Sequence, residues 1–240
     1  MSNNIKNKVL LVGSGNIGYD YVEILRGFKV DIDVVGRSYR SRRKFNHRTG
    51  LYVYDGIQNY INKNPKPPKY AIVAVNENQL SDVTLSLINY GVKNILLEKP
   101  GGLSISELTE IKNKSNLKSS NVYIGYNRRF YKSVEWCKEY LEDKKEPLNV
   151  HFEFTEWSEK IEALKLHDQI NNNWALCNSS HVIDLAFYLC GYPREIEAKT
   201  SGKDLLSWHP KASIFYGVGE TRDNIIFNYK FILWRLDCKR

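Results

Sequence analysis

The chain reads VLLVGSGNIG at residues 9–18, and this stretch decides the fold. An apolar run of strand character stops at Gly13, and the pattern of a helix begins directly after Gly15. Backbone N–H groups in such a turn can bind a diphosphate, because the dipole of the helix favours an anion at its N-terminus. Gly13 permits the tight turn, Gly15 leaves room for the phosphates, and Gly18 lets helix and strand pack closely. The predicted diphosphate site comprises Gly13, Gly15, Asn16, Ile17 and Gly18.

Size and composition indicate a folded intracellular protein. The 240 residues are enough for one large or two small domains, and a hydrophobic fraction of 42% supports a sizeable core. The cysteines form no CxxC pair and no metal-ligand spacing, so we expect free thiols in a reducing compartment and no metal site. They are Cys137, Cys177, Cys190 and Cys238. The N-terminal stretch has no signal-peptide pattern, and no apolar segment is long enough to span a bilayer, so we expect a cytoplasmic protein with no membrane partner.

The net charge of +8 raises the question of nucleic-acid binding. No zinc-finger, helix-turn-helix or RRM pattern occurs, and most lysines are scattered, as on an ordinary solvated surface. The densest basic cluster comprises Arg37, Arg40, Arg42, Arg43, Lys44 and Arg48. It follows the second expected strand, and a narrower explanation for it is given below, so nucleic acid is not an expected partner.

Segments of strand and helix character alternate through the first half of the chain. Strands are expected at 8–12, 30–35, 51–54, 70–75, 94–98 and 121–125. Helices are expected at 16–26, 79–90, 104–116 and 129–143. Alternation of this kind predicts βαβ units, and therefore an α/β fold with a doubly wound parallel sheet.

The pattern changes near Pro147. Residues 151–157 alternate polar and apolar, as an antiparallel strand with one wet face does. One strong helix is expected at 179–190. Further strands are expected at 194–200, 211–218 and 223–236. The second part is therefore predicted to be an α+β domain in which a helix packs on a mainly antiparallel open sheet.

Four motifs occur in an order that resembles the Gfo/Idh/MocA oxidoreductases. They are GSGNIG at 13–18, EKP at 98–100, GYNRRF at 125–130 and SHVID at 180–184. The resemblance implies a Rossmann dinucleotide-binding domain at 1–126 and a substrate and oligomerisation domain at 127–240. It also implies an NAD(P)-dependent dehydrogenase that moves a hydride between nicotinamide and a hydroxyl or keto group of a sugar, nucleotide-sugar or polyol.

The resemblance also assigns candidate site residues. Lys99, at the end of a parallel strand where ligands of such sheets bind, would transfer a proton or polarise a carbonyl. His181 would be its partner, since imidazole acts as acid or base near neutral pH. Candidate substrate-binding residues are Asn127, Asn178 and Asp184, and Asp184 could equally be a helix-dipole residue. Further candidate cofactor-binding residues are Val75, Asn76 and Glu98.

The end of the second strand predicts which nicotinamide cofactor binds. NAD sites place an acid there to bind the ribose hydroxyls, but Gly36 occupies about this position. Arg37 and Ser38 follow, and arginine binds phosphate through paired hydrogen bonds. We therefore expect NADP over NAD. The alternative is an ordinary solvated basic loop.

Two departures from the family pattern leave an alternative open. The usual glycine-rich stretch is replaced by asparagines at 171–173, and Cys177 occupies the position of an aspartate that normally joins the catalytic group. A dinucleotide-binding sensor or partner protein with weak or no turnover is therefore the second hypothesis. Family members also usually continue through more strands than this chain offers. An open sheet edge invites pairing, so a homo-oligomer through the C-terminal sheet is expected.

Overall fold

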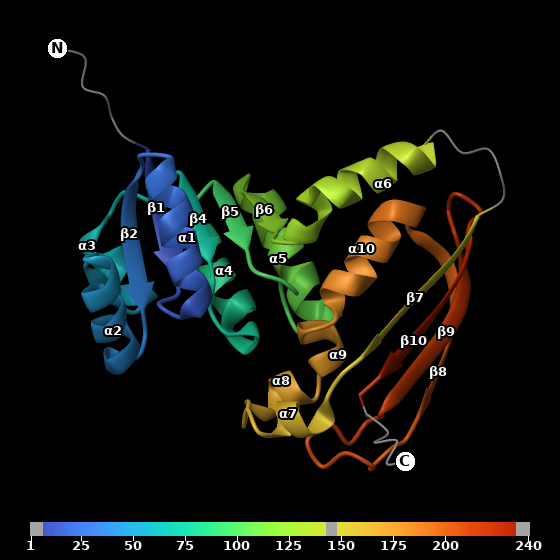
Figure 1. Cartoon of the computed structure of the whole chain (residues 1–240). Coiled ribbons are helices and arrows are strands. Elements are labelled where there is room, and N and C mark those ends of the chain that lie inside the picture. The colour runs from blue at the N-terminus through green and yellow to red at the C-terminus, as the bar shows by residue number, and fades with distance from the viewer. Residues whose placement is uncertain (1–6, 143–147, 234–240) are drawn as a thin grey trace. The chain divides into compact units, whose positions relative to one another are not determined.

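The computed structural model describes residues 7–142 and 148–233. The chain divides into two compact units, residues 1–125 and 126–240. Within the described ranges no helix is both long and apolar enough to cross a membrane. The α/β fold class is confirmed, with a parallel sheet in the first unit and a separate, mainly antiparallel sheet in the second (Figure 1).

The first unit is built on a six-stranded sheet in the order β3-β2-β1-β4-β5-β6, with all pairs parallel. The strands are β1 (Lys8–Val12), β2 (Asp31–Gly36), β3 (Val53–Asp55), β4 (Tyr70–Val73), β5 (Asn94–Leu97) and β6 (Asn121–Ile124). The helices are α1 (Asn16–Gly27), α2 (Tyr39–Thr49), α3 (Ile57–Lys63), α4 (Leu80–Tyr90) and α5 (Ile105–Lys118), with a 3-10 turn η1 (Glu77–Gln79). The order reverses between β1 and β4, which is where ligands bind in doubly wound sheets.

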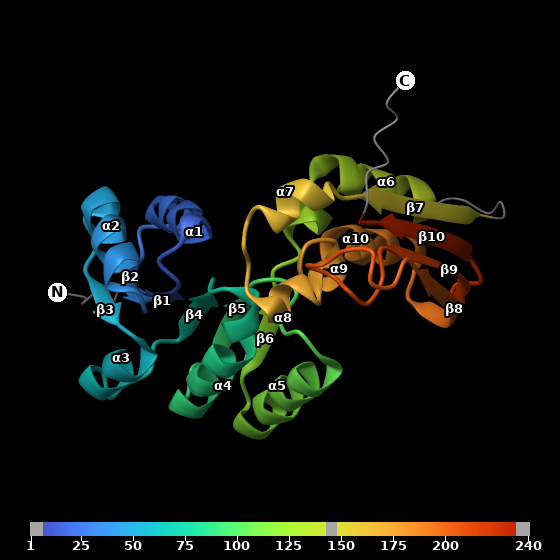
Figure 2. The same cartoon turned by 90° about the horizontal axis from the view of Figure 1, so that it is seen from below.

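Helices cover both faces of this sheet, α1 and α2 on one side and α3, α4 and α5 on the other (Figure 2). Successive side chains of a strand point to opposite faces, so a central strand must be apolar throughout. In β1, Leu10 packs with Leu80 and Leu87 of α4, whereas Leu11 packs with Val22 of α1 and Phe45 of α2. This double burial explains the unbroken apolar run before the glycine turn.

Helix α2 was not among the helices expected from the sequence. Its sequence YRSRRKFNHRT has one fully buried side chain, Phe45, so the apolar periodicity of an amphipathic helix is missing. The helix is instead defined at its ends. Ser38 accepts a hydrogen bond from the Ser41 N–H, and Gly50 closes the last turn in the left-handed conformation with φ of 71°.

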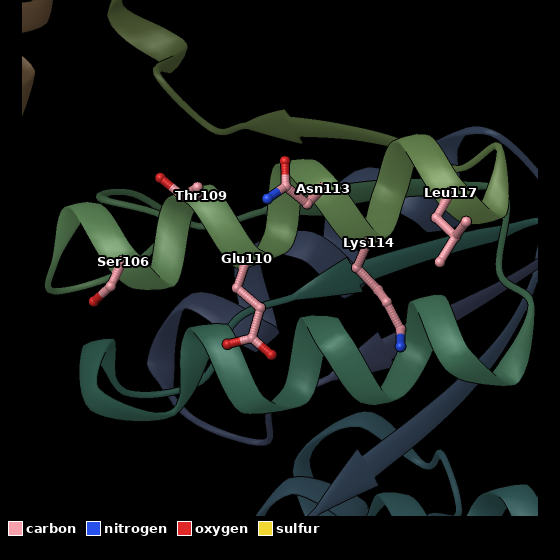
Figure 3. Close-up of a pocket in the computed structure, with 6 residues that line it drawn as sticks. All are labelled: Ser106, Thr109, Glu110, Asn113, Lys114 and Leu117. Atoms are coloured by element: carbon pink, nitrogen blue, oxygen red, sulfur yellow. The ribbon is translucent and has the colours of Figure 1, made fainter.

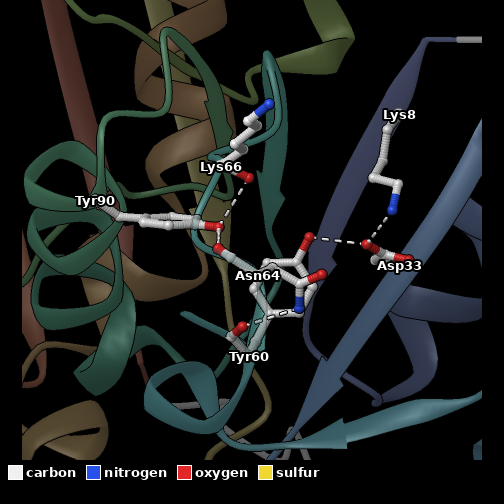
Figure 4. A network of polar contacts seen from close by, with 6 residues as sticks. All are labelled: Lys8, Asp33, Tyr60, Asn64, Lys66 and Tyr90. Atoms are coloured by element: carbon white, nitrogen blue, oxygen red, sulfur yellow. Dashed lines mark hydrogen bonds and ion pairs between the residues drawn. The ribbon is translucent and has the colours of Figure 1, made fainter. Parts of the chain in front are cut away.

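A polar network links α3 to the sheet (Figure 4). The buried Tyr60 hydroxyl donates to Asp33 at 2.8 Å, and Lys8 forms an ion pair with the same carboxylate oxygen at 3.0 Å. The Tyr90 hydroxyl donates to the Asn64 carbonyl and, at 3.1 Å, to the Lys66 carbonyl. Buried polar groups need such partners, because an unpaired one costs about 1–3 kcal/mol.

The second unit contains a four-stranded sheet in the order β7-β10-β9-β8. The strands are β7 (Asn149–Thr155), β8 (Pro193–Ser201), β9 (Ile214–Thr221) and β10 (Ile226–Ile232). The helices are α6 (Lys132–Glu142), α7 (Ser158–Glu162), α8 (Asp168–Asn171), α9 (Trp174–Cys177) and α10 (Ser180–Cys190), with a 3-10 turn η2 (Asn127–Phe130). β10 pairs parallel with β7 and antiparallel with β9, and β8 pairs antiparallel with β9.

Helix α10 packs on this sheet through aromatic residues. Phe187 meets Phe152 and Phe227 edge to face, with ring centroids 5.6 and 5.1 Å apart. On β9, a side chain at Gly217 or Gly219 would collide with the rings of Tyr229 and Phe227, so glycine is needed where the rings lie flat on the strand. The core of the second unit therefore forms between α10 and one face of the sheet.

Several elements differ from the expectation: the strand expected at 211–218 lies at Ile214–Thr221, and the short helices α3, α7, α8 and α9 are not predicted from the sequence. The helix expected at 129–143 begins only at Lys132, because residues 127–130 form the tighter turn η2. The strand expected at 223–236 begins at Ile226, and its last residues, 234–236, lie outside the described residues.

Candidate active site

The carboxyl ends of four parallel strands in the first unit bring the predicted cofactor residues to one edge of the sheet. β1 leads into Gly13, β2 into Arg37, β4 into Val75 and β5 into Glu98. Main-chain hydrogen bonds extend the strand pairing into these turns: the Ala74 N–H donates to Val12 at 2.8 Å, and the Glu98 N–H donates to Val73 at 2.9 Å. The edge is therefore fixed by the sheet itself.

The glycine turn has the geometry that its sequence requires. Gly13 has φ of 136°, and a Cβ there would lie 2.0 Å from the Ala74 carbonyl oxygen. A Cβ at Gly18 would lie 2.6 Å from the Gly13 oxygen, whereas one at Gly15 would meet open space. The close approach of β4 and of the helix thus needs Gly13 and Gly18, and Gly15 faces outward.

The N-terminus of α1 is suited to an anion. Gly15, Asn16 and Ile17 are exposed, no side chain caps the helix, and its first turn holds no acidic residue. The first N–H groups of a helix have no partner within it and carry partial positive charge. The residues present therefore fit the diphosphate of a dinucleotide.

The end of β2 excludes an acidic side chain at position 36. A Cβ on Gly36 would lie 2.4 Å from Ser14 Oγ and 2.8 Å from Arg42 Cγ. Ser14 Oγ is in turn 3.0 Å from Ser41 Oγ, which ties the glycine turn to α2. The carboxylate that usually binds the ribose hydroxyls has no room here.

Basic side chains surround this strand end. Arg37 is exposed, and with the Gln79 amide turned so that its oxygen faces the guanidinium, two hydrogen bonds of 2.8 and 3.0 Å form. Arg42 forms an ion pair of 2.9 Å with Asp55 at the end of β3. Ser38 uses its Oγ to cap α2. Arg37 can therefore reach from β2 to the turn after β4.

Glu98 and Lys99 follow β5. The Tyr21 hydroxyl of α1 donates to Glu98 Oε1 at 2.5 Å, and burial, followed by this hydrogen bond, raises the pKa of Tyr21. The carboxylate is thereby fixed in orientation. Lys99 is half-buried, and the peptide bond between Lys99 and Pro100 is cis. Val75 and Asn76 lie in the turn after β4, where Asn76 is exposed and starts η1.

The substrate candidates of the second unit gather around the first half of α10. His181 lies in the first turn, with its ring edge to face against Tyr126 at 5.9 Å. Asp184, one turn later, receives two hydrogen bonds from Arg129 of η2, one of them from Nε at 2.8 Å. This paired contact raises the pKa of Arg129. Asn127, in the same turn η2, is exposed.

Asn178 lies just before α10, and its side chain is held by Glu156. The Asn178 amide donates to Glu156 Oε1, which also accepts from Ser179 Oγ at 3.5 Å. Cys177 beside it is buried, with 1% of its surface exposed. The thiol therefore fills space at the position where the family resemblance expects a carboxylate.

Two cavities lie away from the strand ends. One of about 470 Å³ is lined by α5 alone, where the side chains of Glu110 and Lys114 reach toward α4 (Figure 3). Another of about 690 Å³ lies at the C-terminal end of α10 and includes Lys138, Tyr188 and Arg222. In the part of the chain that the structure describes, no group of three His, Cys, Asp or Glu side chains could hold a metal ion.

Sequence reasoning missed several residues of these sites. Tyr21, Ser14 and Gln79 gave no signal, because a single helical tyrosine, a turn serine or a surface glutamine fits many roles. Asp55 did carry a sequence signal, because it ends a strand of the parallel sheet and ligands bind at such strand ends. Glu156 directly follows β7, but a glutamate after an alternating strand gives no reason to single it out from the sequence.

A family model described as "Oxidoreductase family, NAD-binding Rossmann fold" matches residues 7–126. Comparison with curated protein sequences gave no match. Solved structures, in contrast, match nearly the whole chain.

The WlbA dehydrogenase from Chromobacterium violaceum, in complex with NADH and UDP-GlcNAcA, has a TM-score of 0.81 at 16% identity, covering 98% of this chain and 69% of that one. WlbA from Bordetella pertussis, in complex with the same ligands, has a TM-score of 0.81 at 12% identity, with 97% and 72% covered. An oxidoreductase from Agrobacterium radiobacter, in complex with NAD+, L-tartaric acid and magnesium, has a TM-score of 0.76 at 14% identity, with 97% and 68% covered. At these identities the likeness shows the fold alone.

Proposed function

The chain belongs to the Gfo/Idh/MocA oxidoreductases, and from this premise we propose that it is an NADP-dependent dehydrogenase or reductase of a sugar, nucleotide-sugar or polyol. One observation carries the proposal: an open, uncapped helix N-terminus and Lys99 occur at the same carboxyl edge of one parallel sheet. This is the edge at which doubly wound sheets bind their ligands. The solved WlbA structures, which share the fold, hold NADH and a nucleotide-sugar.

The first unit would hold the dinucleotide through its backbone. Gly13, Gly15 and Gly18 with Asn16 and Ile17 would bind the diphosphate at the start of α1. Val75 and Asn76, in the turn after β4, would contact the dinucleotide. Glu98, whose carboxylate accepts a hydrogen bond from Tyr21, would lie beside the nicotinamide ring. The nicotinamide would supply or accept the hydride when bound.

The preference for NADP follows from charge and space at the end of β2. Position 36 has no room for an acid, and Arg37 with Ser38 can bind a 2′-phosphate through charge-assisted hydrogen bonds. Asp55 offsets part of this charge through its ion pair with Arg42. Arg37, Arg40 and Arg43 still leave the net local charge positive.

Lys99 and His181 would handle the proton. In the oxidation direction, Lys99 would accept the O–H proton of the substrate. His181, in the second unit, would be its partner in proton transfer. Asn127, Asn178 and Asp184 would bind the other hydroxyls, although Asp184 already serves Arg129.

A second function, a dinucleotide-binding sensor or partner protein without turnover, rests on Cys177. Its thiol is buried where the resemblance expects a carboxylate of the catalytic group. Such a protein would bind NADPH and a sugar without converting either.

Titration of the protein with NADPH and NADH, followed by nicotinamide fluorescence, tests the cofactor. We expect NADPH to bind at least about tenfold more tightly, a difference of about 1.4 kcal/mol. Turnover is then measured with UDP-GlcNAcA, UDP-GlcNAc, myo-inositol and simple hexoses in both reaction directions. NADPH binding without turnover favours the sensor, and binding of neither cofactor contradicts both functions.

A further inference from the structure

Glu156 is a carboxylate that the motifs did not single out. It follows β7 directly, and its N–H donates to the Ile232 carbonyl at 2.8 Å, which extends the β7–β10 pairing by one residue. Its side chain is half-buried and turns toward the segment that leads into α10. The sheet thus fixes where this carboxylate lies.

One oxygen of Glu156 accepts hydrogen bonds from the two residues that precede α10. Oε1 accepts from the amide of Asn178 and from the hydroxyl of Ser179, the residue before the helix. The helix has no side-chain cap of its own and no acidic residue in its first turn. A carboxylate at this end is favoured by the helix dipole. Because the Asn178 amide nitrogen is directed at Glu156, its oxygen is directed away from it, as an acceptor.

We propose that Glu156 is a substrate-binding residue: Oε1 fixes Asn178 and Ser179, and Oε2 accepts a hydrogen bond from a hydroxyl of the sugar substrate. The inference rests on the proposed function and adds a residue to its site. Both contacts made by the carboxylate within the described residues use Oε1. Asp184 differs, since Arg129 engages both of its oxygens.

The chemistry of the pair suits a polyhydroxylated ring. A carboxylate oxygen accepts a short, charge-assisted hydrogen bond from a hydroxyl, and an adjacent amide oxygen accepts a second one. Neighbouring hydroxyls of a sugar present two donors at this kind of spacing. His181, three residues after Asn178, would then meet the oxygen of the reacting carbon, while Glu156 and Asn178 select the hydroxyls beside it.

The test compares Glu156→Gln, which keeps shape but loses the charge, with Glu159→Gln three residues on, an exposed control. UDP-GlcNAcA and myo-inositol are titrated calorimetrically into the NADPH-bound protein. For whichever sugar binds the wild type, we expect Glu156→Gln to weaken binding about 10- to 100-fold, as for a lost hydrogen bond to a charged group. Glu159→Gln should stay within about twofold, and NADPH affinity should not change in either variant.

Two further readouts separate substrate binding from support of the fold. KM for the sugar should rise while kcat at saturation changes less, and Glu156→Asp should restore part of the affinity. Equal sugar affinity in Glu156→Gln and wild type overturns the proposal. The proposal is also overturned if Glu156→Gln weakens binding of the sugar and of NADPH equally and lowers the melting temperature, because Glu156 would then support the fold. If the wild type binds neither sugar, the proposed substrate class fails and the role of Glu156 with it.

Discussion

At the scale of single residues, the proposed mechanism depends most on Lys99. Lys99→Ala should lower kcat about 10²- to 10⁴-fold, the usual contribution of a positioned acid or base. The dissociation constant of NADPH should change little, because the diphosphate and 2′-phosphate are assigned to other residues. Stopped-flow turnover and fluorescence titration measure the two quantities separately.

Lys112→Ala, an exposed lysine of α5, is the matched control and should behave as wild type. Unchanged turnover in Lys99→Ala would remove the lysine from the mechanism. A parallel loss of turnover and NADPH binding would instead make it a cofactor ligand.

Gly36 and Ser14 together should decide between the two cofactors. Gly36→Asp alone places a Cβ 2.4 Å from Ser14 Oγ, so it should lower the melting temperature and weaken both cofactors. Adding Ser14→Gly removes Ser14 Oγ and Cβ, and leaves Arg42 Cγ, 2.8 Å from the new Cβ, as the one close atom that must shift. The double variant should then prefer NADH, because the new carboxylate binds ribose hydroxyls and repels a phosphate. If the double variant keeps the preference for NADPH, the steric argument is wrong.

At the scale of elements, Ser38 caps α2 and is also the residue proposed to bind the 2′-phosphate. Ser38→Ala should cost about 0.5–2 kcal/mol of unfolding free energy through loss of the cap. Ser38→Asp keeps a capping oxygen but adds negative charge, so stability should be retained while NADPH affinity falls at least about tenfold and NADH affinity changes less. Urea unfolding and cofactor titration give the two values. A loss of affinity for both cofactors alike would place Ser38 outside the 2′-phosphate site.

The same helix shows what the sequence could predict. β1, α1 and α4 have apolar patterns that match their burial, and glycines lie at their ends, so the sequence predicts their bounds within about two residues. Helix α2 buries only Phe45, so the sequence gives no helical pattern for it, because its ends rather than its face define it. Site residues held by tertiary contacts, such as Tyr21 on Glu98 or Glu156 on Asn178, depend on elements far apart in the chain and give no local pattern.

The network around Tyr60 should make stability fall in alkaline solution. Burial, followed by the hydrogen bond to Asp33, raises the pKa of Tyr60 above the usual value of about 10. The unfolded chain therefore loses this proton first as pH rises, so the stabilisation is present below about pH 10 and is lost above it. Tyr60→Phe should be less stable by about 1–3 kcal/mol at pH 8 and should show a weaker pH dependence above pH 10.

Urea unfolding from pH 8 to 11 measures this dependence. Tyr52→Phe is the control, since Tyr52 is exposed and its ring only meets that of Tyr54 edge to face. A slope identical in wild type and Tyr60→Phe would show that other tyrosines carry the alkaline transition.

At the scale of the whole molecule, the two units divide the chemistry. The first unit carries the glycine turn, the basic strand end and Lys99, all set by one parallel sheet. The second carries His181, Asn178 and Glu156 at one end of α10, the helix that packs on one face of the second sheet. The proposed assignments therefore place Lys99 and the cofactor residues in the first unit and His181 in the second.

The face of the second sheet opposite α10 should mediate self-association. Tyr216 and Val218 alternate on β9 with the glycines that face the aromatic core, so they point to the opposite side, and both are exposed. Ile226, across the pair from Glu220, adds a third exposed apolar side chain on this face. Exposed apolar residues grouped on one sheet face are typical of protein interfaces.

Val218→Asp should therefore raise the dissociation constant of the oligomer at least about tenfold, because it would bury an unpaired charge in the interface. Leu117→Asp, on the exposed side of α5 in the first unit, is the matched control and should leave the oligomer intact. Light scattering over a dilution series measures both. A wild-type monomer at all concentrations would contradict the interface, and dissociation by Leu117→Asp but not by Val218→Asp would move it to the first unit. NADPH binding should be unaffected in Val218→Asp, since the dinucleotide residues all belong to the other unit, so a loss of binding would mean that association orders the cofactor edge.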